Sequence, residues 1–168
     1  MTIIERLRQY KELDPHKIAL IVDDKKYTYG DLYDAILSID INDTSRIVNV
    51  AQTKESPKHI VALIQSQSFV EQLVQWLAGL YTGYIPMVCH NEMDTEYVEE
   101  LARIIAYKGV APLADFGVLT SGTTGRPKPL WRSESSWSEF FDIQNDIFHI
   151  NKDTRIFLHG SFSVTGVS

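Results

Sequence analysis

The sequence predicts an α/β fold with alternating strands and helices and a largely parallel sheet. Short apolar runs typical of buried strands recur at 46–51, 59–64, 84–88 and 116–120. Segments between the later runs carry apolar residues at helical spacing behind residues that cap helices. Because parallel neighbours need a long crossover connection, strands that alternate with helices favour parallel pairing. The 168 residues, 44% of them hydrophobic, suffice for a single domain over 1–168.

The first predicted elements are a hairpin and a helix. Apolar residues at 20–22 and 27–28 flank the polar turn 23–26, which favours two short antiparallel strands. Thr28 and Asp31 have the spacing of a capping box, so a helix is expected to follow. Its predicted inward face consists of Leu32, Ala35, Ile36 and Ile39.

Two further helices are expected after apolar strands. Ser68 and Glu71 have capping-box spacing, and the helix that they start is predicted to end at Gly83. Asp94 is predicted to cap the next helix, which ends near Gly109. The predicted inward faces are Phe69, Val70, Leu73, Val74, Leu77, Leu80 and Tyr81 in the first helix, and Tyr97, Leu101, Ile104 and Ile105 in the second.

Acidic residues gather between 92 and 100, at the start of the second of these helices. A metal site is one interpretation, but the helix macrodipole also favours negative charge at an N-terminus. We therefore predict a solvated face, with Glu99 placed to pair with Arg103 one turn later. We assign no metal ligands.

The C-terminal part is predicted to hold one more helix and a last strand at 155–162. Apolar residues repeat along one face of this helix, which suits core packing better than a cofactor pocket. These residues are Trp137, Phe140, Phe141, Ile147 and Phe148.

Charge and composition narrow the range of partners. The net charge of −6 argues against nucleic acid or an anionic membrane as a general partner. No apolar run approaches the roughly 20 residues that span a bilayer, and no signal peptide is visible. The single cysteine, Cys89, excludes an internal disulfide and favours a reducing cytoplasm. We interpret it as a small strand-end residue rather than a nucleophile.

The loop after the run 116–120 carries most of the functional information. Residues 119–128 read Leu-Thr-Ser-Gly-Thr-Thr-Gly-Arg-Pro-Lys. Glycines let the backbone approach a ligand closely, hydroxyls donate hydrogen bonds, and lysine supplies positive charge. These groups suit the phosphate tail of ATP. The predicted phosphate-binding residues are Thr120, Ser121, Gly122, Thr123, Thr124, Gly125 and Lys128.

Two other interpretations of this loop compete with phosphate binding. A Walker A loop needs a glycine directly before the lysine and a serine or threonine after it, whereas Pro127 precedes Lys128 and Pro129 follows it. A flexible linker or surface turn has a similar composition. The apolar strand before the loop and the Pro-Lys pair at its end favour the phosphate loop over the linker.

The loop resembles the phosphate-binding signature of the adenylate-forming superfamily, which includes acyl-CoA synthetases, luciferases and the adenylation domains of peptide synthetases. The usual form is an aromatic residue followed by Thr-Ser-Gly-Thr-Thr-Gly-x-Pro-Lys-Gly, and the chain departs from it at Leu119 and Pro129. Pro129 removes a backbone donor and a flexible joint beside Lys128. Weaker similarities at 18–39 and 60–86 extend the resemblance over most of the chain.

The resemblance implies the first part of the large N-terminal domain of such an enzyme, with the phosphate loop at 119–129. It also implies activation of a carboxylic acid by ATP and Mg²⁺ as an acyl-adenylate, then transfer to CoA or a carrier thiol, in the cytoplasm. Complete members are much longer and hold further motifs, so we expect an N-terminal portion and assign no catalytic residue. Two alternatives stay open: a non-catalytic phosphate-binding or protein-interaction module that retains the fold, and an amino-acid adenylation domain.

Overall fold

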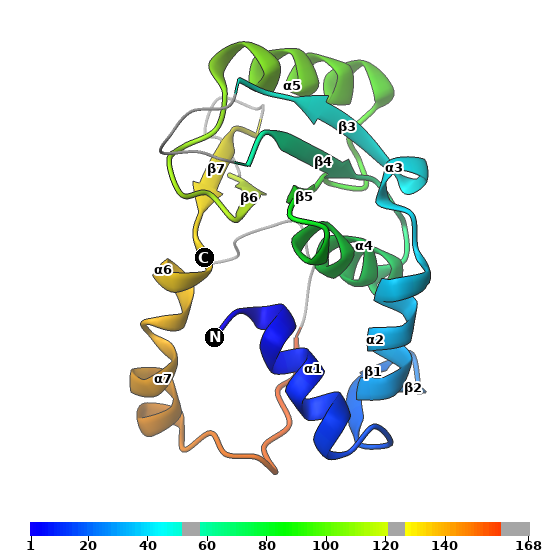
Figure 1. Cartoon of the computed structure of the whole chain (residues 1–168), viewed down its shortest axis with the longest axis vertical. Coiled ribbons are helices and arrows are strands. Elements are labelled where there is room, and N and C mark those ends of the chain that lie inside the picture. The colour runs from blue at the N-terminus through cyan, green and yellow to red at the C-terminus, as the bar shows by residue number, and fades with distance from the viewer. Residues whose placement is uncertain (52–57, 121–126, 159–168) are drawn as a thin grey trace.

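A computed structural model describes residues 1–51, 58–120 and 127–158 (Figure 1). Its helices are α1 (Ile3–Leu13), α2 (Tyr29–Ser38), α3 (Ile41–Thr44), α4 (Phe69–Tyr81), α5 (Thr95–Lys108), α6 (Glu134–Ser138) and α7 (Phe141–Phe148). Its strands are β1 (Ile18–Val22), β2 (Lys25–Thr28), β3 (Ser45–Asn49), β4 (Ile60–Ile64), β5 (Ile85–Val88), β6 (Phe116–Leu119) and β7 (Pro129–Arg132). Among the helices described, none has the length and apolar character needed to cross a membrane.

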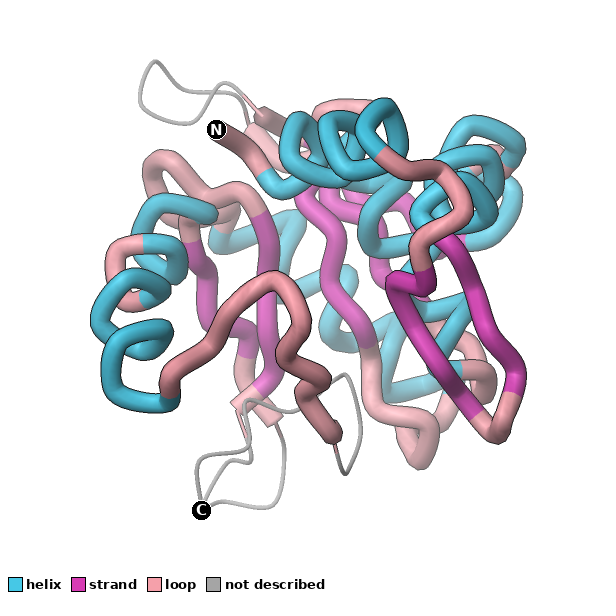
Figure 2. The backbone as a smooth tube through the Cα atoms, turned by 90° about the horizontal axis from the view of Figure 1, so that it is seen from below, coloured by secondary structure: helices cyan, strands magenta, loops and turns pink. Residues whose placement is uncertain are grey.

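The main sheet has the strand order β3-β4-β5-β6-β7. Its three central strands are parallel, whereas β3 pairs with β4 and β7 pairs with β6 in antiparallel fashion. The predicted α/β class is therefore confirmed, with a mixed sheet whose centre is parallel. The predicted hairpin is a separate two-stranded sheet of β1 and β2 (Figure 2). Its turn is shorter than predicted, because Asp23 and Asp24 alone form it, with φ of 48° and 63°.

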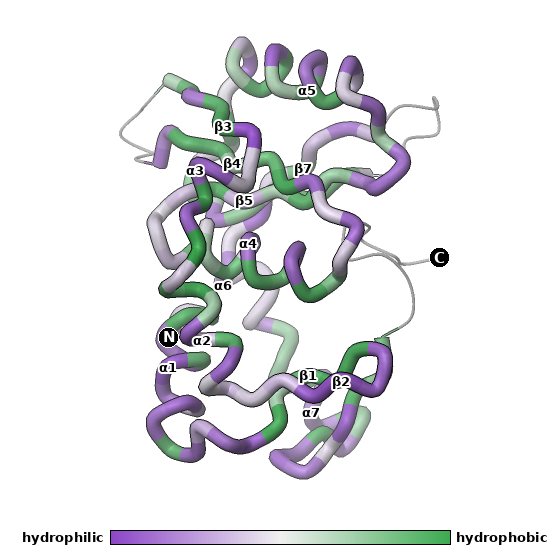
Figure 3. The backbone as a smooth tube through the Cα atoms, turned by 90° about the vertical axis from the view of Figure 1, so that its right-hand side faces the viewer, coloured by the Kyte–Doolittle hydropathy of each residue, from purple (hydrophilic) through white to green (hydrophobic). Residues whose placement is uncertain are grey.

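Helices cover both faces of the main sheet (Figure 1). Alternate side chains of the central strands point to opposite sides, as the two-residue period of a strand requires. One buried layer packs under α5, where Leu101 and Ile105 are almost fully buried. The other lies against α4, with α1 and α2 behind it. Hydrophobic and hydrophilic residues alternate along α5, as expected for a helix with one buried face (Figure 3).

The helices α2, α4 and α5 begin directly after the capping residues that the sequence predicted. Thr28 and Asp31 form a complete capping box at α2, and their hydrogen bonds lower the pKa of the Asp31 carboxyl. Asp94 caps α5 through the backbone N–H of Tyr97. Ser68 caps α4 as predicted, but the carboxylate of Glu71 accepts a hydrogen bond from the hydroxyl of Ser66 instead of closing a box.

Three predicted features of the packing are wrong. The late aromatic residues do not form the face of one buried helix, because the chain breaks into α6 and α7, and these side chains are between 39% and 69% exposed. The described part of the predicted last strand, 155–158, forms no strand. Glu99 pairs with Arg46 of β3 at 2.9 Å rather than with Arg103, whose Nε donates to the carbonyl of Glu99. Pairing across elements thus replaces the pairing along the helix.

Candidate phosphate-binding site

The predicted phosphate loop begins at the carboxyl end of the parallel part of the sheet. Because β4, β5 and β6 run in the same direction, the segments that follow them lie along one edge, with neighbouring strands about 4.8 Å apart. Ligands of open α/β sheets bind beyond this edge. The loop that starts at Thr120 is therefore where the fold places ligand sites.

The two ends of the loop are held together by a hairpin. The backbone N–H of Thr120 donates to the carbonyl of Lys128 at 2.9 Å. The N–H of Lys128 donates to Oγ1 of Thr120 at 3.3 Å. The antiparallel pairing continues from Leu119 with Pro129 to Phe116 with Arg132. This return strand, β7, was not expected from the sequence.

Two of the predicted phosphate-binding residues are described directly. Thr120 is half-buried and Lys128 is exposed, and they face each other across the open end of the β6–β7 hairpin. Ser121, Gly122, Thr123, Thr124 and Gly125 lie outside the described residues, so their role stays a prediction.

Pro129 costs the hairpin no hydrogen bond between β6 and β7. In an antiparallel pair, residues whose N–H groups point at the partner alternate with residues whose N–H groups point away. Thr120 and Lys128 are a hydrogen-bonded pair, so Leu119 and Pro129 occupy the next, non-bonded pair. The missing N–H of Pro129 would point away from β6, and proline is tolerated at the first residue of an edge strand. This departure from the signature therefore costs no hydrogen bond in the pairing of β6 with β7.

A tyrosine of α5 forms a hydrogen bond to the segment that leads from the loop into β7. The hydroxyl of Tyr97 donates to the carbonyl of Pro127, directly before Lys128. The sequence predicted Tyr97 as an inward-facing residue, and it is half-buried. The spacing of apolar residues gives no indication of this bond, because the two residues are 30 positions apart.

Polar residues line a cavity of about 630 Å³ at the same edge of the sheet, formed by the segments that follow β4 and β5 and by the start of α4. Gln72 of α4, almost fully buried, joins the two segments that form its walls. Its Nε2 donates to the carbonyl of Ser66 at 2.6 Å and to Oδ1 of Asn91 at 2.8 Å. The loops that follow β4 and β5 are therefore fixed relative to each other beside the strand that delivers the phosphate loop.

Sequence similarity to known proteins covers almost the whole chain. No family model matches it. The chain is 25% identical over 186 aligned residues to the putative long chain fatty acid-CoA ligase VraA of Staphylococcus aureus, with 96% of the chain covered. This similarity supports the resemblance of the chain to the adenylate-forming superfamily. The chain spans 38% of the length of that relative.

Solved adenylate-forming enzymes have the same fold. A structure of o-succinylbenzoate CoA synthetase (MenE) from Bacillus subtilis, bound with the product analogue OSB-NCoA, matches 92% of the chain and 38% of its own length, with a TM-score of 0.62 and 16% identity. MenE in complex with the acyl-adenylate intermediate OSB-AMP matches 90% of the chain and 47% of its own length, with a TM-score of 0.57 and 16% identity. At this level of identity the likeness concerns the fold alone.

The single cysteine of the chain lies in the core. Cys89 follows β5, is fully buried, and has a thiol pKa that burial raises to about 12. A raised pKa leaves almost no thiolate at mildly alkaline pH, and burial blocks reagents. We expect a thiol reagent such as dithionitrobenzoate to leave the native protein unmodified and to react fully in urea. Rapid reaction of the native protein would contradict the buried, structural role.

Proposed function

We propose that the chain supplies the phosphate-binding part of the ATP site in an acyl-CoA synthetase-like, adenylate-forming enzyme. The observation that supports this most is the β6–β7 hairpin, which pairs Thr120 with Lys128, the two described ends of the signature, at the carboxyl edge of the parallel strands. The similarity to a putative long chain fatty acid-CoA ligase of Staphylococcus aureus supports a long-chain fatty acid as the carboxylate. CoA is the proposed acceptor, with a carrier-protein thiol as the other option.

In the proposed reaction the carboxylate oxygen attacks the α-phosphorus of ATP, and the bond to the β-phosphate oxygen breaks. The products are an acyl-adenylate and pyrophosphate, and a thiol then displaces AMP. Lys128 would balance negative charge on the β- and γ-phosphates as pyrophosphate departs. Ser121, Thr123 and Thr124 would donate to phosphate oxygens, while Gly122 and Gly125 would let the backbone approach.

Thr120 has a different proposed task from the other loop residues. Its backbone N–H and its hydroxyl oxygen are both engaged by Lys128 across the hairpin. We therefore assign it the positioning of Lys128, and its hydroxyl hydrogen stays available to donate to a phosphate oxygen. Tyr97 would assist by holding the carbonyl of Pro127.

Mg²⁺ would enter this site with the nucleotide. Within the described residues there is no group of three or more His, Cys, Asp or Glu side chains that could hold a metal ion. Mg²⁺ prefers to keep several water ligands and to bind through substrate phosphates, so the loop needs no metal cluster of its own. ATP, CoA and the single free cysteine together suggest a cytoplasmic setting.

Exchange of labelled pyrophosphate into ATP tests the proposal in the whole enzyme of which this chain would be the phosphate-binding part, with straight-chain fatty acids of increasing length as carboxylates. Lys128→Ala and Thr124→Val are expected to lower the exchange rate by roughly tenfold or more, because each removes a group that contacts the departing phosphates. Lys26→Ala is the matched control, since Lys26 lies exposed in β2. Unchanged exchange in both loop variants would contradict the proposal.

A further inference from the structure

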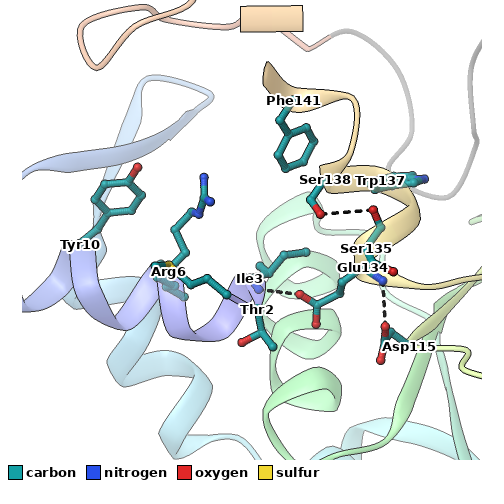
Figure 4. Close-up of a pocket in the computed structure, with 12 residues that line it drawn as sticks. Thr2, Ile3, Arg6, Tyr10, Asp115, Glu134, Ser135, Trp137, Ser138 and Phe141 are labelled. Atoms are coloured by element: carbon teal, nitrogen blue, oxygen red, sulfur yellow. Dashed lines mark hydrogen bonds between the residues drawn. The ribbon is translucent and has the colours of Figure 1, made fainter. Parts of the chain in front are cut away.

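A second cavity lies far from the phosphate loop, between α1 and the α6–α7 pair (Figure 4). It has a volume of about 490 Å³, within the roughly 300–1,000 Å³ range of small-molecule sites. Asp115, which precedes β6, lines this groove, whereas Thr120 follows β6 at the phosphate loop. Five extended residues separate the two by about 16 Å. The groove therefore lies at the opposite edge of the sheet from the proposed ATP site.

The walls of the groove are mostly apolar. Leu7 of α1 lies on one side, and Trp137 of α6 and Phe141 of α7 lie on the other. Trp137 packs edge-to-face on the buried Phe116, with ring centroids 5.0 Å apart, and Phe116 packs in the same way on Trp76 at 5.3 Å. This aromatic stack fixes the Trp137 wall to the core of the sheet.

The carboxylates of the groove are already engaged. Glu134 accepts a hydrogen bond from the backbone N–H of Ile3 at 2.6 Å. Asp115 accepts one from the backbone N–H of Glu134 at 2.8 Å and pairs with Lys58 at 2.6 Å. The guanidinium of Arg6 has no hydrogen-bond or ion-pair partner in the part of the chain that the structure describes. It points into the space between Tyr10 and Phe141 (Figure 4).

We infer that this groove binds a monoanionic amphiphile, namely an alkyl carboxylate, at a site separate from the phosphate loop. The guanidinium of Arg6 matches the two oxygens of a carboxylate, and the hydroxyl of Tyr10 adds a donor at the same end. The alkyl chain lies along Leu7, Trp137 and Phe141, where it is removed from water. The nearby Glu134 and Asp115 disfavour a doubly charged head group such as a phosphate monoester.

Calorimetric titration of the chain with decanoate, below its micelle-forming concentration, tests this site. Decylammonium serves as the probe of equal chain length and opposite charge. Decanoate is expected to bind saturably at one site, and Arg6→Gln is expected to weaken its affinity by roughly tenfold or more. Arg8→Gln is the matched control, because Arg8 is exposed on the same helix but does not line the groove. Circular dichroism checks that both variants keep the fold.

Four results would overturn the inference. Decanoate that fails to bind the native chain excludes the site. If decanoate binds Arg6→Gln as tightly as the native chain, Arg6 has no role in binding. If decylammonium binds the native chain as tightly as decanoate does, the charge of the head group has no role. Dimerisation in sedimentation experiments that blocks decanoate binding assigns the groove to a second copy instead. The site does not depend on ATP, so the titration is decisive whether or not the proposed enzyme activity is found.

Discussion

Phe116→Ala is expected to destabilise the protein by about 3–5 kcal/mol. Phe116 is 1% exposed and stands at the start of β6, between the rings of Trp76 and Trp137. Removing its ring loses buried apolar area and leaves a cavity that a packed core fills only in part. The same change detaches the Trp137 wall from the sheet. Urea unfolding followed by circular dichroism measures the free energy of unfolding.

Phe157→Ala is the matched control for this loss, because it makes the same chemical change at a side chain that is 88% exposed. Its free energy of unfolding is expected to stay within about 0.5 kcal/mol of the native value. A similar loss in both variants would show that Phe116 is not the core residue that links β6 to α4 and α6.

Gly117→Val is expected to destabilise the protein by about 3 kcal/mol, through overpacking rather than through a cavity. A Cβ atom at Gly117 would lie 2.2 Å from Cε of Met87 and 2.9 Å from Cζ3 of Trp131. β6 therefore passes between β5 and β7 at a point where an added side chain displaces Met87 and Trp131. Because Thr120 follows three residues later, a displaced β6 also moves the ends of the phosphate loop. Both the free energy of unfolding in urea and the affinity for Mg-ATP are expected to decrease.

A second substitution tests the cause of this effect. Met87→Ala removes the side chain that lies closest to the added group, so the double variant Gly117→Val with Met87→Ala is expected to be less unstable than the sum of the two single losses. Simple additivity of the two losses would point to backbone conformation instead of crowding.

The elements that the sequence predicted well are those with local signals. Capping residues such as Thr28 and Asp94 act on backbone groups two or three positions away, so their effect is visible in the sequence itself. Buried strands appear as short apolar runs for the same reason. α1 is an exception, because Thr2 and Glu5 form a complete capping box in the sequence and yet this helix was not predicted.

The features that the sequence did not predict depend on contacts between distant residues. Glu99 had a suitable partner one turn along its helix, but the fold brings Arg46 of β3 within 2.9 Å. Helical periodicity identified the late aromatic residues as apolar, but it does not specify whether another element covers them. Trp137 alone among them packs on the ring of the buried Phe116 in the described structure.

In the candidate site, too, local signals were predicted and contacts between distant residues were not. Residue types identified the loop and its lysine without any structure. The return strand β7 was not predicted, because Pro129 is rare inside strands and the pairing with Leu119 is visible only across the loop. With that strand in place, the absent N–H of Pro129 costs no hydrogen bond to β6, since it lies on the side away from that strand.

Calorimetric titration with Mg-ATP tests the central claim, that the loop closed by Thr120 and Lys128 binds the phosphates of ATP. We predict saturable binding to the native chain and to Lys26→Ala, and an affinity lower by roughly tenfold for Lys128→Ala. Equal affinity of Lys128→Ala and the native chain, or no binding of Mg-ATP at all, would contradict the claim.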